Sequence, residues 1–309
     1  MRTIPPFPSG CLLQDSGFRI RDSCSGIPYN TLVDEPDIFN EAMRIAKVEY
    51  PELDVERVRA MLDDFGREGR AVVKSRGRRG VEQFNAYFFD TLGFHGNVED
   101  YYDPRNSYLN DVIERRTGIP ITLALIYMEV ARRAGLPVEG VNFPGHFLLR
   151  CPARRGMPYA EDLIIDAFHG GALLSRELLQ RRYESRSAFH DHLGDSSSIE
   201  SRLLPHATKP QILARMLLNL KRVYVRMLSF PQARDITELL IAVDPSAHNE
   251  LRDRGLLAYH LKDFPAALRD LQAYLQLTSS SRLDQEERQE HEQIWEHVKT
   301  LRKRVASLN

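Results

Sequence analysis

The clearest hydrophobic pattern in the chain runs from Pro120 to Ala134. Proline suits the first turn of a helix, where its missing N–H costs no hydrogen bond, and most of the residues that follow are good helix formers. Apolar residues cover most of the helix circumference, and only Glu129, Arg132 and Arg133 leave a polar edge. The pattern therefore predicts a central, buried helix that ends at Gly135.

Three short runs of strand-forming residues follow this helix, at 138–142, 146–151 and 163–166. His146 opens the second run, and Asp166 ends the third. A carboxylate at the end of an apolar strand is costly unless it is paired. We therefore expect Asp166 to accept a hydrogen bond from a ring N–H of His146, which would fix the tautomer of that imidazole.

A second histidine, His169, follows Asp166 in a turn rich in glycine. A metal site built from His146, Asp166 and His169 is one interpretation of this grouping. Our prediction is that the chain carries no metal ion and no other cofactor.

The region before the central helix is expected to be mostly helical. Apolar residues recur at helical spacing from Asp37 to Ala46, from Leu53 to Phe65 and again over 83–92. These three helices should pack as a layer around the central helix. Residues 1–35 have no clear period and are expected to form an extended or disordered arm.

A turn-rich loop lies between the third helix and the central helix. Loops with this much Asn, Asp, Tyr and Arg either pin the backbone through an internal network or face a ligand. Both interpretations stay open for the candidate binding residues Tyr101, Arg105, Asn106 and Tyr108. We expect a short helix over 112–116, capped by Ser107, Asn110 or Asp111.

The C-terminal third of the chain is plainly helical and repeats itself at a constant offset, which matches the length of a tetratricopeptide unit. At that offset Phe230-Pro231 falls on Phe264-Pro265, and Ala233 falls on Ala267. Gly255 occupies a small-residue position, where two antiparallel helices must approach closely. Because two units are few for a free-standing array, we expect the tail to pack either on the first domain or on a capping helix, which the charged helix 285–305 would supply.

The words YYDPRNSYLN, GIPITL, PGHF and IID resemble those of a transglutaminase-like domain, of the bacterial SirB-type branch that adds a tetratricopeptide tail. The resemblance implies an α+β, papain-like domain over 36–195, with a central buried helix and a small antiparallel sheet. An all-α tetratricopeptide-like tail would follow over 205–309. In enzymes of this type the nucleophilic Cys begins the central helix, where the macrodipole favours a thiolate.

The chain departs from the enzymatic pattern at that position. Counting back from Gly135 over the length of the central helix lands on Pro120 instead of Cys. The nearest side chain with a nucleophilic atom is Thr122, and a hydroxyl without strong activation is a far weaker nucleophile than a thiolate. A second hypothesis brings Cys24 of the N-terminal arm to His146, against the simpler interpretation of Cys24 as a free thiol.

Composition limits the classes of partner. The net charge of −1 gives no whole-molecule attraction to nucleic acid or to a membrane surface, and no stretch reaches membrane length. The three cysteines, Cys11, Cys24 and Cys151, have no metal-type spacing, and their odd number argues against a disulfide framework. We therefore expect a cytoplasmic protein that binds neither nucleic acid nor membrane.

Two hypotheses for function follow. The first is a protein-interaction or regulatory scaffold, which binds a protein or peptide through its repeats. The second is a hydrolase or acyl transferase on amide or ester bonds, with His146 as base and Asp166 as its orienting partner. Its nucleophile would be Thr122, water or a recruited Cys.

Overall fold

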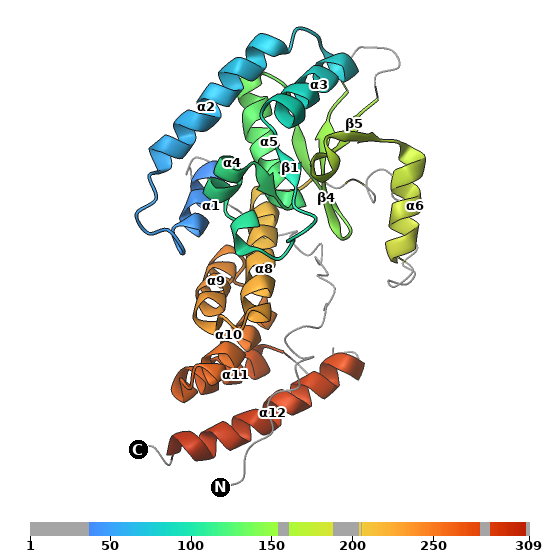
Figure 1. Cartoon of the computed structure of the whole chain (residues 1–309). Helices are drawn as coiled ribbons and strands as arrows, with labels where there is room; N and C mark the ends of the chain where they lie inside the picture. The colour runs from blue at the N-terminus through green and yellow to red at the C-terminus, as the bar shows by residue number, and fades with distance from the viewer. Residues whose placement is uncertain (1–36, 154–160, 188–203, 205, 279–284, 307–309) are drawn as a thin grey trace, which may run out of the picture. The chain divides into compact units, whose positions relative to one another are not determined.

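The computed structural model describes residues 37–153, 161–187, 204, 206–278 and 285–306 (Figure 1). The expected N-terminal arm, with Cys11 and Cys24, lies outside the described residues, as do residues 188–203 around the expected domain boundary. Contacts divide the chain into two compact units, one over Ile38–Asn219 and one that contains Leu220–Asn309. Each unit is described by itself.

The first unit begins with the predicted helices. They are α1 (Ile38–Ala46), α2 (Val55–Val72) and α3 (Gly77–Asn85), which continues into the π-helical segment η1 (Ala86–Thr91). Asp54 caps α2, because its side chain accepts a hydrogen bond from the Arg57 N–H at 3.1 Å. The third helix begins earlier than predicted, at Gly77.

The short helix α4 spans Leu109–Arg115, so the expected start at residue 112 and the expected cap are wrong. Tyr108 occupies the N-cap position without a side-chain hydrogen bond, and Asn110 and Asp111 lie inside the helix. The reason is a distant contact: the Asp111 carboxylate accepts a hydrogen bond from the Tyr50 hydroxyl at 2.7 Å. That bond satisfies the carboxylate without a capping role.

The predicted central helix is confirmed as α5 (Pro120–Ala134). Proline is its first residue, and Gly135 ends it with the left-handed φ of 84° that glycine adopts without steric cost. Helix α5 packs against α2 on one side and against strands β3 and β4 on the other. A Cβ on Gly66 of α2 would overlap Arg133 Cβ, so glycine permits the close approach of α2 and α5.

The predicted small antiparallel sheet is also confirmed. Its order is β3 (Glu139–Phe143), β4 (His146–Cys151), β5 (Leu163–Asp166), β6 (Ala172–Leu174). Helix α6 (Arg176–Ser187) contributes Leu179 to an apolar cluster that includes Leu148 and Ile164. The sheet therefore lies between α5 and α6 (Figure 1). A short parallel pair, β1 (His95–Gly96) and β2 (Thr117–Gly118), lies before α5.

The C-terminal helices repeat with the predicted period. Helix α9 (Phe230–Val243) recurs as α11 (Phe264–Leu277), one repeat length later at both its start and its end. Helices α8 (Lys209–Arg226) and α10 (His248–His260) end one repeat length apart. The division between the two units falls within α8. Gly255 of α10 is buried, and an added Cβ would lie 2.8 Å from Leu271 Cγ of α11, which confirms the predicted small-residue position.

The last helix, α12 (Gln285–Ala306), provides the expected cap. Its apolar stripe of Ile294, Val298 and Leu301 is buried in one cluster with Leu256 and Leu271. None of the helices over the described residues is long and apolar enough to cross a membrane.

Candidate functional site

The sheet brings His146 and Asp166 together as predicted. Strands β4 and β5 pair Leu149 with Ile165, so the alternation of side chains places His146 and Asp166 on the same face of the sheet. His146 Nε2 lies 2.9 Å from Asp166 Oδ1. The bond fixes this imidazole with its N–H at Nε2 while Asp166 is ionised, because a carboxylate only accepts hydrogen bonds. Nδ1 has no hydrogen-bond partner among the described residues.

Asp166 is fully buried and has two further partners. His169 Nδ1 lies 2.8 Å and Arg182 Nη1 lies 3.4 Å from its Oδ2. Burial alone would raise the pKa of Asp166, but the hydrogen bonds and charges of His146 and His169 outweigh burial and lower the pKa to about 2. The carboxylate is therefore ionised at neutral pH and holds both imidazoles in place.

Cys151 is the one cysteine among the described residues, and its environment does not favour a thiolate. It lies on β4 five residues after His146, so strand alternation directs the two side chains to opposite faces. Burial, with the nearby carboxylates of Asp162 and Glu139, raises the pKa of its thiol to about 11.

The start of α5 is closed by packing. Ile119, Pro120, Ile121 and Thr122 are all buried. The Thr122 hydroxyl donates to the Asn106 carbonyl at 2.7 Å and accepts from the Ile119 N–H at 3.2 Å. Thr122 therefore caps the helix and ties it to the preceding loop. Its hydrogen is already committed, which favours a structural role over that of a nucleophile.

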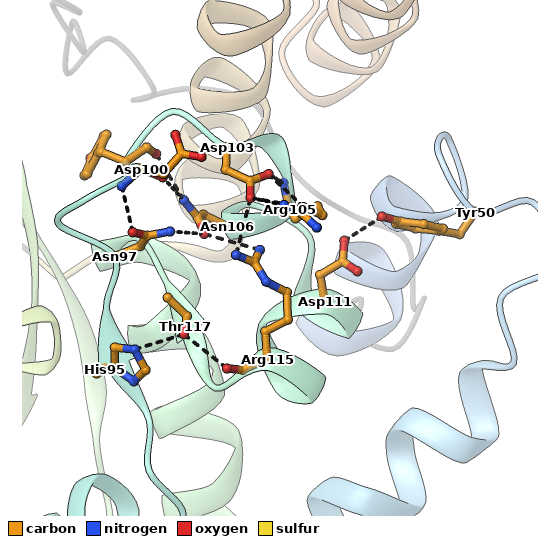
Figure 2. Close-up of polar contacts among 11 residues, drawn as sticks. Tyr50, His95, Asn97, Asp100, Asp103, Arg105, Asn106, Asp111, Arg115 and Thr117 are labelled. Atoms are coloured by element: carbon orange, nitrogen blue, oxygen red, sulfur yellow. Dashed lines mark hydrogen bonds and ion pairs between the residues drawn. The ribbon is translucent and has the colours of Figure 1, made fainter.

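Asn106 lies at the centre of a polar network in the loop before α5 (Figure 2). Its Nδ2 donates to the carbonyls of Asp100 at 2.7 Å and Tyr101 at 3.3 Å, and its Oδ1 accepts from Asn97 Nδ2 at 3.1 Å. Asn106 is fully buried. Between the two interpretations of this residue, the geometry favours a network that pins the backbone.

Asp103 organises the neighbouring part of the loop and was missed from the sequence. Its carboxylate caps the 3-10 helix η2 (Pro104–Asn106), accepting from the Arg105 N–H at 2.9 Å, and pairs with the guanidinium groups of Arg105 at 2.8 Å and Arg115 at 3.3 Å (Figure 2). Burial opposes ionisation, but the bonds from Arg105 lower the pKa of Asp103. The Asp-Pro step before a turn is the sequence signal that could have identified this cap.

The four candidate binding residues divide between the interior and the surface. Tyr108 and Asn106 are buried, with Tyr108 in an edge contact with Tyr50 at 5.7 Å between ring centroids. Tyr101 and Arg105 are exposed. Tyr101 lies near His169. The ring centroids of Tyr101 and Phe168 are 6.2 Å apart, and Phe168 adjoins His169 in η3 (Ala167–His169).

Comparison with known proteins identifies the family of the chain. The family model described as the transglutaminase-like superfamily matches residues 56–218, more than half of the chain. The chain belongs to the transglutaminase-like superfamily. A tetratricopeptide repeat model matches residues 220–297 of this transglutaminase-like protein, which confirms the repeats expected from the period of the sequence.

Bacterial relatives of this transglutaminase-like protein match most of its length. It is 39% identical over 252 residues to the UPF0162 protein of Xylella fastidiosa, which covers 79% of this chain and 85% of the relative. It is 27% identical over 245 residues to the UPF0162 protein of Vibrio cholerae, over 79% of this chain and 87% of the relative.

A eukaryotic relative matches over a smaller region. F-box only protein 21 of Mus musculus is 34% identical over 192 residues, which are 60% of this transglutaminase-like protein and 28% of the mouse protein. No solved structure matches the chain.

Proposed function

We propose that this transglutaminase-like protein is a protein-interaction or regulatory scaffold whose domain no longer carries the catalytic cysteine. The observation that carries the proposal is Pro120 at the first position of α5, where enzymes of this type place the thiol. A proline there offers neither a nucleophilic side chain nor a free backbone N–H. The surrounding residues, Ile119 and Ile121, are buried and apolar.

The repeat unit supports an interaction role, because tetratricopeptide repeats generally mediate contacts between proteins. An open groove of about 430 Å³ lies between α11 and α12. Its lining mixes apolar and polar side chains: Pro265, Leu268, Arg269, Gln272, Ala273, Gln276 and Val305. We propose that a peptide segment of a partner protein binds in this groove, in the cytoplasm and without nucleic acid or membrane.

The test is affinity purification of the full chain and two variants, with partners identified by mass spectrometry. Ala273→Arg fills the groove with a residue that still favours a helix, whereas Gln289→Arg adds the same side chain at an exposed position of α12 outside the groove. We expect Ala273→Arg to lose partners that both the wild type and Gln289→Arg recover. Identical sets of partners in all three would contradict the groove as the docking surface.

The His146–Asp166 pair favours a second candidate function, hydrolysis or acyl transfer on amide or ester bonds. With its N–H directed to Asp166, His146 has Nδ1 left to act as a general base. Water is the nucleophile that needs no rearrangement of the described residues. A carbonyl substrate would then be attacked by the water that His146 deprotonates, and His146 would return the proton to the leaving group.

This alternative is tested by hydrolysis of a panel of amides and activated esters. His146→Ala should abolish turnover if the imidazole is the base. His206→Ala removes an exposed histidine of the same unit and should leave turnover unchanged. Hydrolysis that survives His146→Ala, or no hydrolysis at all, would exclude the dyad as a catalytic base for these substrates.

A further inference from the structure

His146, Asp166 and His169 form a cluster of three side chains that bind metals, and one ligand atom of each lies within 4.8 Å of the others. His146 begins β4, Asp166 ends β5, and His169 lies one 3-10 turn later, in η3. Three elements therefore direct two imidazoles and a carboxylate to one point.

The donor set is one that proteins use for divalent transition metals. Two histidines and one carboxylate on one face leave the remaining positions of a six-coordinate ion open. Asp166 Oδ1 lies 2.9 Å from His146 Nε2, and Asp166 Oδ2 lies 2.8 Å from His169 Nδ1. Donor atoms at that spacing, each roughly 2.1 Å from an ion, subtend about 85°, near the right angle of adjacent octahedral positions.

The three side chains of the cluster differ in their exposure to solvent. Asp166 is fully buried, His146 is 13% exposed and His169 is 55% exposed. An ion can therefore approach past His169. Because its side chain is more than half exposed, His169 is also free to move closer to the other two donors. Donors bound to one ion at roughly 2.1 Å lie no more than about 4.2 Å apart, so two donor atoms as far apart as 4.8 Å would have to approach each other on binding.

Among the described residues that contact the Asp166 carboxylate directly, Arg182 is the one cation other than the histidines. It would compete with a metal ion for this carboxylate. Its Nη1 lies 3.4 Å from Asp166 Oδ2, and its side chain is 39% exposed. A metal ion at the cluster would repel this guanidinium, which can move into solvent. In the metal-free protein, Arg182 and the two imidazole N–H groups satisfy the carboxylate.

Against the prediction from the sequence that the chain carries no metal ion, we propose that His146, Asp166 and His169 bind one divalent transition metal ion. Binding requires each neutral imidazole to move its proton to the other ring nitrogen, so that the nitrogen facing Asp166 presents a lone pair to the ion. Water fills the open positions on the His169 side. The inference is independent of the scaffold role, because the groove between α11 and α12 does not include these residues.

The experiment uses metal-stripped full-length protein, titrated with Zn²⁺ by calorimetry and with Co²⁺ by visible absorption. We expect one ion per chain. His169→Ala should weaken binding more than about tenfold. His206→Ala, which removes an exposed histidine outside the cluster, should bind as the wild type does. Because His169 is more than half exposed, circular dichroism should show the same fold for His169→Ala and wild type.

Arg182→Ala provides a second measurement, with the opposite sign. Removal of the competing cation should tighten Zn²⁺ binding, whereas a purely structural network would gain no metal affinity from it. The proposal is overturned if the wild type binds no ion, if His169→Ala binds as tightly as the wild type, or if Arg182→Ala weakens binding.

Discussion

At the scale of single residues, the Asp166 carboxylate links pH to stability. Its ordinary pKa is 3.8, and the folded protein lowers the pKa to about 2. Its contribution to stability is therefore fully present above about pH 4 and is lost as the pH falls toward 2. The difference between the two pKa values corresponds to about 2 kcal/mol of unfolding free energy.

Urea unfolding at several pH values between 7 and 2 would measure this contribution. We expect the unfolding free energy of the wild type to fall by about 2 kcal/mol more than that of Asp166→Asn over the acidic range, because the amide does not titrate there. Equal pH dependence of the two proteins would show that Asp166 is not held ionised by His146 and His169.

Asn106 is expected to be the residue of the loop before α5 that tolerates substitution least. Asn106→Ala should lower the unfolding free energy by about 2–3 kcal/mol, because it removes a buried amide that donates to the carbonyls of Asp100 and Tyr101 and accepts from Asn97 Nδ2. Asn40 offers a matched control: it accepts a hydrogen bond from Arg59 at an exposed position, and Asn40→Ala should cost less than about 0.5 kcal/mol. Similar costs for both variants would contradict the network.

At the scale of elements, the repeat extends to the turns between its helices. Leu228 and Lys262 occupy equivalent positions of the two repeats, and both adopt the left-handed region, with φ of 59° and 64°. Residues other than glycine are strained there. Lys262→Gly should therefore raise the unfolding free energy by about 0.5–1 kcal/mol, whereas Lys262→Ala should not. Thermal unfolding compares the three proteins, and a loss of stability in Lys262→Gly would contradict the strain.

The sequence predicted the elements that local patterns determine. The position of α5 followed from its apolar residues, with Pro120 at its start and Gly135 at its end. The period of the repeat located α9 and α11. The start of α4 and its cap could not be predicted, because the Tyr50–Asp111 bond joins residues 61 positions apart. The contact of Arg182 with Asp166 likewise depends on the packing of α6 against the sheet, for which the chain offers no local signal.

At the scale of the whole molecule, both units bear on the proposed scaffold role. The transglutaminase-like unit holds a buried His–Asp pair, and proline begins its central helix. The repeat unit offers a groove between two helices. The scaffold role requires that binding through the repeats persists when His146 is removed. His146→Ala should therefore recover the same partners as the wild type in affinity purification, and loss of those partners would place the binding site at the dyad.

The most direct test of the scaffold role is covalent labelling of the full chain by acyl probes that react with activated thiols and hydroxyls. Intact-mass spectrometry would compare the wild type with His146→Ala, and peptide mapping would assign any labelled residue. We predict the same low labelling in both proteins. Labelling of Cys24, Cys11 or Thr122 in the wild type that disappears in His146→Ala would contradict this account and identify a working nucleophile.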